Sequence, residues 1–216
     1  MTIKENILPR TFFSSCKVSA AICSIVFILA ALASCTDSDG IEDHTYDRWQ
    51  ERNDSAFHAV FTEAQKAIGQ GSNQWRIIRR TDSTLPTSES NSIVVRIDKE
   101  GTGIECPYYT DSVRVNYIGS LLTGKSFDHS GFYSEYESVF SPQLCRPASM
   151  LVSGTVPGFA TALQYMHIGD IWHVWMPQQL GYGTEKKEKI PAYSMLQFDI
   201  QLVQYARRGQ PLPLWK

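Results

Sequence analysis

Segments in which apolar and polar residues alternate are the feature that most restricts the fold of this chain. Residues 113–117 read Val-Arg-Val-Asn-Tyr, residues 172–176 place Trp, Val and Met at every second position, and residues 196–202 do the same with Leu, Phe, Ile and Leu. Such alternation predicts strands with one buried face and one face open to water. Strands of this kind are typical of antiparallel sheets.

A short helix is expected between the first and second of these regions. Phe159, Leu163 and Met166 have helical spacing, Pro157-Gly158 fits the first turn, and Gly169 fits the end. The order strand, long loop, strand, short helix, strand, loop, strand predicts an α+β fold. In it, one helix lies on the concave face of a twisted antiparallel sheet.

A longer amphipathic helix is predicted upstream, over residues 45–68, and Gly69 and Gly71 are expected to end it. Its apolar residues recur at intervals of three and four and are Trp49, Phe57, Val60, Phe61, Ala64 and Ile68. Two interpretations stay open, a dimerisation or client-docking arm and a helix whose apolar stripe packs on the following domain. We favour the second.

Two strand-like segments follow this helix, at residues 75–79 and 93–97. A polar, proline-containing stretch, residues 81–91, separates them. We interpret this region as a linker or a hairpin.

The N-terminal segment has the pattern of a bacterial export signal. An almost unbroken apolar run, Val18–Ala33, follows the basic residues Lys4, Arg10 and Lys17. Leu32-Ala33-Ser34-Cys35 resembles a lipobox, which implies that Cys35 is acylated and becomes the first mature residue. A retained membrane anchor is the alternative, but the run is shorter than the ~20 residues that a spanning helix needs.

Composition limits what the mature chain can do. Cleavage before Cys35 leaves 182 of 216 residues, enough for one domain and an extension. Removing three basic and one acidic residue from totals of 20 and 22 leaves 17 against 21, a net charge near −4, which gives no sign of nucleic-acid binding.

Cys106 and Cys145 are as compatible with a disulfide as with two free thiols. The cysteines and histidines show no metal-ligand spacing, so we expect neither a metal nor a cofactor.

Several short motifs occur in a fixed order between residues 113 and 203. They are residues 115–119 (VNYIG), 124–128 (GKSFD), 156–159 (VPGF), Gly169, 180–183 (LGYG), 190–191 (IP) and 196–199 (LQFD). In this order and spacing they resemble the FKBP-type peptidyl-prolyl isomerases. With its lipid-anchor signal and N-terminal helix, the chain looks like an exported bacterial lipoprotein member of that family, of the Bacteroidetes type.

The resemblance implies a set of residues around a bound proline ring: Tyr117, Phe127, Asp128, Val156, Phe159, Tyr182, Ile190 and Phe198. It implies that the Val156 N–H and the Tyr182 hydroxyl bind substrate carbonyls, and that Asp128 orients polar groups. The chain departs from the family at Phe159, where tryptophan is common, and at Met150, where a wall phenylalanine is frequent. The loop Gly131–Arg146 is longer than usual, and we expect it to be able to cover the pocket.

A hydrolase with a catalytic triad is the other enzyme class that the sequence suggests, because it places His129, His167 and His173 near Asp128 and several serines. The chain has no G-x-S-x-G nucleophile motif, so we disfavour this interpretation.

The function implied by the resemblance is prolyl isomerisation that assists the folding of exported proteins. The expected partners are proline-containing polypeptides, a membrane bound through lipid such as palmitate on Cys35, and a macrolide ligand. The alternative is a catalytically weak FKBP-like binding or chaperone module on the cell envelope. The predicted divisions are a signal peptide (1–34), a lipidated tether (35–44), a helix and strand extension (45–110), an isomerase domain (111–206) and a tail (207–216).

Overall fold

The computed structural model describes residues 44–81, 84, 86–131 and 146–214. The chain divides into two compact units, Met1–Thr45 and Tyr46–Lys216, and every described strand lies in the second. The predicted signal peptide and Cys35 fall outside the described residues, as does Cys145. Of the two cysteines considered for a disulfide, Cys106 is half-buried, and burial raises the pKa of its thiol.

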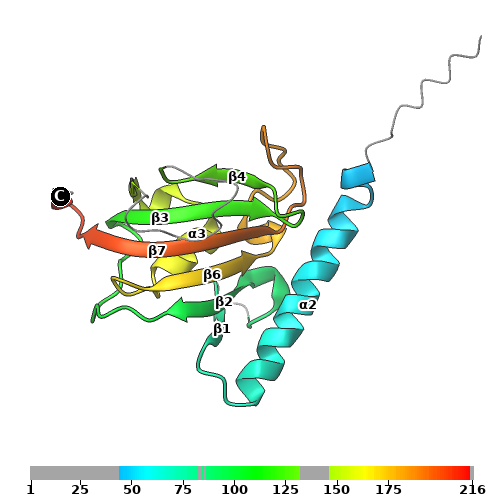
Figure 1. The fold of residues 1–216 in the computed structure, drawn as a ribbon, viewed down its shortest axis with the longest axis horizontal. Coiled ribbons are helices and arrows are strands. Elements are labelled where there is room, and N and C mark those ends of the chain that lie inside the picture. The colour runs from blue at the N-terminus through cyan, green and yellow to red at the C-terminus, as the bar shows by residue number, and fades with distance from the viewer. Residues whose placement is uncertain (1–43, 82–83, 85, 132–145, 215–216) are drawn as a thin grey trace, which may run out of the picture. The chain divides into compact units, whose positions relative to one another are not determined.

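One antiparallel sheet organises the second unit (Figure 1). Its spatial order is β1-β2-β6-β7-β3-β4, and the short strand β5 also pairs with β3. The strands are β1 (Trp75–Arg79), β2 (Ser92–Lys99), β3 (Ser112–Leu121), β4 (Ser126–His129), β5 (Ala148–Leu151), β6 (Ile171–Met176) and β7 (Leu196–Ala206). The helices are α2 (Trp49–Gly69) and α3 (Pro157–Leu163), with 3-10 turns η1 (His44–Tyr46), η2 (Glu89–Asn91), η3 (Val152–Gly154) and η4 (Gln178–Leu180).

The alternation seen in the sequence places one side of each long strand in the core. Val174 on β6 lies opposite Phe198 on β7, and Trp172 lies opposite Ile200. All four side chains are buried in one hydrophobic cluster. The expected α+β fold is therefore confirmed.

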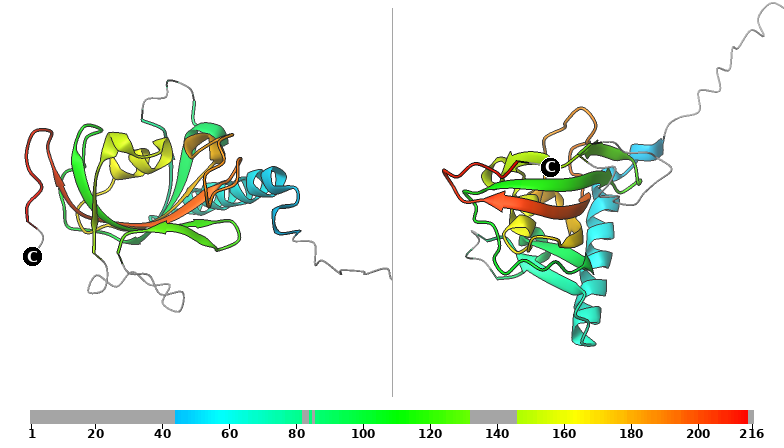
Figure 2. Two further views of the ribbon diagram at one scale, coloured as in Figure 1. Left: turned by 90° about the horizontal axis from the view of Figure 1, so that it is seen from above. Right: turned by 60° about the vertical axis from the view of Figure 1, so that its left-hand side comes forward.

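The helix α3 lies against the concave face of the sheet (Figure 2). Pro157 occupies the first turn, where its missing N–H leaves no helical hydrogen bond unmade. A Cβ added to Gly158 would lie 2.7 Å from the sulfur of Met176. Glycine at this position therefore lets the helix approach β6 closely.

The helix α2 packs on the opposite face of the sheet, near β1, β2 and β6. Phe57, Phe61 and Ala64 form a buried cluster with Val94, whereas the neighbouring Ile93 points into the core beside α3. The strand β2 is therefore covered on both faces over residues 92–95. This contact confirms the favoured interpretation, a helix whose apolar stripe packs on the following domain.

Buried hydrogen bonds fix the first half of α2. The indole of Trp49 donates to Ser194 Oγ at 2.9 Å, and Asn53 Oδ1 accepts from the Met195 N–H at 2.9 Å. At the other end, Gly71 has a φ of 87°, and Ser72 N donates to Ala67 O, a glycine-based helix stop. The prediction that Gly71 helps to end the helix is confirmed.

The segments 75–79 and 92–99 form a hairpin, with Ile77 opposite Val94. The strand β2 then pairs with β6, so the predicted extension contributes two strands to the same sheet as residues 111–206. The division of the chain at residue 110 stays a prediction. Across the described residues, no helix combines the length and apolar character needed to cross a bilayer.

Candidate active site

A cavity of about 350 Å³ opens beside the N-terminus of α3. Residues from β3, β4, β5, β7 and the start of α3 contribute to its walls. Its lining residues are Tyr117, Asp128, Met150, Gly154, Thr155, Val156, Phe159, Tyr182 and Phe198. All of the sequence candidates for the proline site except Phe127 and Ile190 therefore line one cavity.

Aromatic rings meet edge to face around this cavity. The ring centroids of Phe159 and Phe198 are 5.0 Å apart, and those of Tyr117 and Phe159 are 5.8 Å apart. Phe127 packs behind Phe198 at 5.5 Å, and Ile190 is buried in the same cluster. Such contacts add about 0.5–1.5 kcal/mol each beyond burial and hold the walls rigid.

Gly119 makes this ring packing possible. It lies on β3 opposite Phe198 on β7, and a Cβ at Gly119 would lie 2.6 Å from Phe127 and 2.7 Å from Phe198. The position therefore leaves space for Phe198, which lines the cavity, and for Phe127 behind it.

The polar groups of the cavity are few and positioned by hydrogen bonds. The Tyr117 hydroxyl donates to Asp128 Oδ2 at 2.8 Å, and Asp128 Oδ1 accepts from the His129 N–H at 2.9 Å. Burial first, and the carboxylate of Asp128 second, raise the pKa of Tyr117 far above its ordinary value. The phenol therefore stays neutral at physiological pH, and Asp128 acts on it as an orienting acceptor.

Two donors at the cavity remain available for a ligand. Val156 precedes α3 in an extended conformation, and its carbonyl accepts from Ala160 N at 3.0 Å. Neither the Val156 N–H nor the Tyr182 hydroxyl donates to a described residue. The Tyr182 ring is 36% exposed, with Lys187 Nζ at 5.3 Å from its centroid.

Gly154 and Thr155 also line the cavity; Thr155 begins the stretch 155–159 that indicates a pocket in the sequence, whereas Gly154 was not predicted. Both come just before Val156 in the motif, and this adjacency is the signal that points to them. Thr155 is fixed by its N–H and its hydroxyl, which both donate to Val152 O. The loop Gly131–Arg146, expected to cover the pocket, lies outside the described residues from 132 to 145.

The histidines do not support a hydrolase. His129, His167 and His173 are absent from the described lining of the cavity. His173 Nδ1 instead pairs with Asp199 at 2.6 Å, and His167 lies beside Asp170. Among the described residues, no group of three or more His, Cys, Asp or Glu side chains could hold a metal ion.

The part of the chain that forms the cavity is similar to a known protein family. A model of the family described as FKBP-type peptidyl-prolyl cis-trans isomerase matches residues 105–203. These residues are therefore similar to that family, and we call them the FKBP-type domain. It contains every residue that lines the cavity, whereas α2, β1 and β2 lie outside the matched range.

Curated relatives of this FKBP-type domain include bacterial isomerases. The chain is 34% identical over 118 residues to the FKBP-type 22 kDa peptidyl-prolyl cis-trans isomerase of Escherichia coli K12, covering 54% of this chain and 52% of that protein. It is 31% identical over 116 residues to FkpA of Aeromonas hydrophila, covering 54% and 39%. The chain thus spans about half the length, or less, of these relatives.

A solved structure shares the fold. The crystal structure of a peptidyl-prolyl cis-trans isomerase from Pseudomonas syringae matches with a TM-score of 0.50 at 23% identity. The match covers 72% of this chain and 96% of that one. The FKBP-type domain and part of the preceding region therefore have a known architecture.

Proposed function

We propose that this protein is a peptidyl-prolyl cis-trans isomerase acting on proline-containing polypeptides. The observation that carries the proposal is the cavity itself, in which Tyr117, Phe159 and Phe198 meet around a space of about 350 Å³. A proline ring is compact and apolar and fits such a site. The isomerase relatives of the FKBP-type domain support the same reaction.

The proposed mechanism needs no nucleophile. Rotation about an X-Pro bond meets a barrier of ~18–20 kcal/mol because the twisted amide loses its resonance. The planar amide has more charge separation than the twisted one. Moving the bond from water into an apolar cavity therefore destabilises the planar state more than the twisted state. Each 1.36 kcal/mol of preference for the twisted state gives about tenfold in rate.

Individual residues of the cavity position the substrate in the proposed mechanism. Phe159 and Phe198 form walls and floor, Phe127 supports Phe198 from behind, and Asp128 holds the Tyr117 hydroxyl in place. The Val156 N–H donates to the carbonyl of the bound proline. The Tyr182 hydroxyl donates to a second substrate carbonyl.

A catalytically weak binding module is the second candidate, and Met150 favours it. Met150 lines the cavity at the position where the family resemblance expects a phenylalanine wall. A methionine is more flexible than a ring and holds a twisted amide less firmly. Cis/trans relaxation of a proline peptide tests the choice, with binding measured in parallel. Accelerated relaxation supports the isomerase, whereas tight binding with an unchanged relaxation rate supports the binding module.

We further propose that the protein assists folding of exported proteins from the bacterial cell envelope, held there by lipid on Cys35. The apolar run Val18–Ala33 and the sequence ending in Cys35 support this location. Metabolic labelling with palmitate tests it: label on the native protein and its loss in Cys35→Ser are expected. Label retained in Cys35→Ser contradicts the proposal.

A macrolide is proposed as a ligand of the same cavity, supported by the aromatic walls. Competition between the macrolide and a proline peptide is the expected result. Independent binding of both contradicts it.

A further inference from the structure

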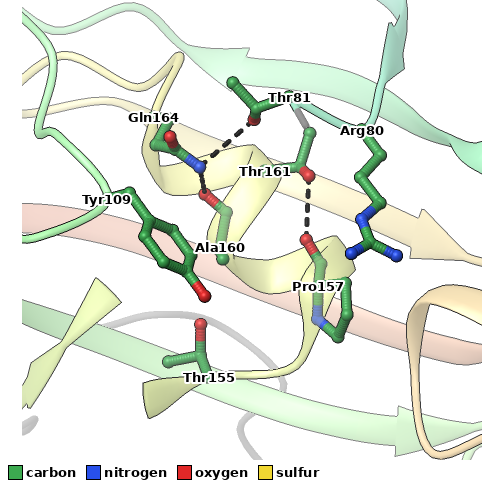
Figure 3. A pocket seen from close by; sticks show the side chains of 8 residues that line it. All are labelled: Arg80, Thr81, Tyr109, Thr155, Pro157, Ala160, Thr161 and Gln164. Atoms are coloured by element: carbon green, nitrogen blue, oxygen red, sulfur yellow. Dashed lines mark hydrogen bonds between the residues drawn. The ribbon is translucent and has the colours of Figure 1, made fainter. Parts of the chain in front are cut away.

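A second hollow lies next to the proline cavity, on the other side of Thr155. Its volume is about 340 Å³, close to that of the cavity itself. Thr155 lines both spaces. Figure 3 shows the second hollow from close by.

The floor of this hollow is one face of α3. Pro157, Ala160, Thr161 and Gln164 recur at intervals of three and four residues, so they share one side of the helix. Phe159, between them in sequence, points to the proline cavity instead. The Thr161 hydroxyl is already used, because it donates to Pro157 O at 2.8 Å. The part of the floor that faces the hollow is therefore mainly apolar.

The walls come from two segments distant in sequence. Arg80 and Thr81 follow β1, and Gln164 Nε2 ties this end to the helix by donating to Thr81 Oγ1 at 3.2 Å. Tyr109, which is 54% exposed, comes from the loop before β3 and extends towards Thr155 with its hydroxyl leading (Figure 3). Arg80 and Thr81 lie outside the matched range 105–203, so the extension helps to build this hollow.

The direction of a bound polypeptide connects the two spaces. In the proposed function, the carbonyl of the bound proline accepts from the Val156 N–H. That carbonyl joins the proline to the next residue, so the following residue leaves the cavity at Val156. Thr155, its neighbour, is the wall that the two spaces share.

We propose that this hollow is a subsite for the residue that follows the proline, and that it prefers an aromatic or large apolar side chain. The apolar floor of Pro157 and Ala160 and the ring of Tyr109 supply the contact surface. The inference rests on the proposed function, because the binding of the proline fixes where the next residue starts.

Two peptides that differ in one residue test the subsite. They share the same X-Pro core and length and carry Phe or Gly after the proline. With native protein, we expect kcat/KM to be about tenfold higher for the Phe peptide, since a half-buried ring contributes on that scale. In Tyr109→Ala the ratio falls to about one, while kcat/KM for the Gly peptide is unchanged. The matched control is Tyr165→Ala, an exposed tyrosine that lines neither space, which keeps the native ratio.

Binding gives a readout independent of catalysis. The NMR amide signals of Thr161 and Gln164 are expected to shift with the Phe peptide and not with the Gly peptide. Equal kcat/KM for the two peptides with native protein, a ratio that survives Tyr109→Ala, or unchanged Thr161 and Gln164 signals overturns the subsite. Failure to accelerate either peptide instead counts against the proposed function, and the shifts of Thr161 and Gln164 still decide the subsite.

Discussion

The hydroxyl of Tyr117 donates a 2.8 Å hydrogen bond to Asp128 Oδ2, joining two residues 11 positions apart on neighbouring strands. The antiparallel pairing of β3 with β4 sets this contact, because Gly119 lies opposite Asp128 two residues along from Tyr117. The bond holds the Tyr117 ring in an edge-to-face contact with Phe159, at an interplanar angle of 79°. One polar contact thus fixes an apolar wall.

The ionisation of Tyr117 gives a first prediction. Burial and Asp128 raise its pKa above the ordinary value of 10.0, so Asp128→Asn should lower the pKa part of the way back, leaving the effect of burial. Below pH 10 the phenol is neutral in both folded and unfolded chains. Above it the unfolded chain ionises first, so stability should fall as the pH rises.

NMR titration of the tyrosine ring carbons measures this pKa, and Tyr117→Phe identifies the signal. The same Tyr117 pKa in native protein and Asp128→Asn contradicts the prediction.

Gly119→Ala should disturb the cavity from a position that does not itself line it. The added Cβ would lie 2.6 Å from Phe127 and 2.7 Å from Phe198, so both rings must move. We expect a stability loss of about 1–3 kcal/mol and a marked fall in isomerase activity. Gly69→Ala is the control, since a Cβ there meets nothing within 4 Å. Urea unfolding and a peptide relaxation assay measure the two effects, and native values for both would contradict the prediction.

The contact between α2 and the sheet predicts unequal effects of two substitutions on one helix. Phe61 is buried against Val94 and its neighbours, whereas Ile68 is exposed. Phe61→Ala should cost about 3–5 kcal/mol, and Ile68→Ala less than about 1 kcal/mol. Equal losses in urea unfolding would mean that α2 does not pack on this face.

Asp111 anchors the start of the C-terminal segment. This carboxylate is 1% exposed and accepts from Arg207 at 2.7 Å and from the Tyr108 N–H at 2.8 Å. Asp111→Ala leaves these donors without their acceptor and should cost about 2–3 kcal/mol. Glu105→Gln, which alters an exposed partner of Arg207, should change the thermal midpoint little. A midpoint for Asp111→Ala equal to the native one contradicts this role.

Local patterns predicted much of the fold. The alternation in residues 172–176 and 196–202 and the spacing of Phe159, Leu163 and Met166 each depend on near neighbours, and the structure confirms them. The pairing of β2 with β6 joins segments about eighty residues apart, as the register of Val94 with Trp175 shows. The pairing partner of β2 can be identified only from the assembled sheet. The sequence therefore predicted no more than a linker or a hairpin for residues 75–97.

The site was predictable for a different reason. Motif order identified Tyr117, Asp128, Val156, Phe159 and Tyr182, and the structure brings them to one cavity. The bond between Tyr117 and Asp128 and the roles of Gly154 and Thr155 depend on strand register and on the turn before α3, which motif spacing does not contain.

The tail shows the same limit. The sequence predicts a tail from residue 207 but not its contacts: Arg207 binds Asp111 and Glu105, and Arg114 donates to Pro213 O at 2.7 Å. These long-range partners fix the segment to the sheet.

The cis/trans exchange rate of an X-Pro peptide, measured with native protein and with Phe127→Ala, shows directly whether the aromatic cavity catalyses isomerisation. Phe127 supports the cavity wall through its contact with Phe198, and Tyr165→Ala serves as a control outside the cavity. We expect strong acceleration by native protein and Tyr165→Ala, and at least a tenfold loss, about 1.4 kcal/mol, in folded Phe127→Ala. Full acceleration by folded Phe127→Ala, or none by native protein, would contradict it.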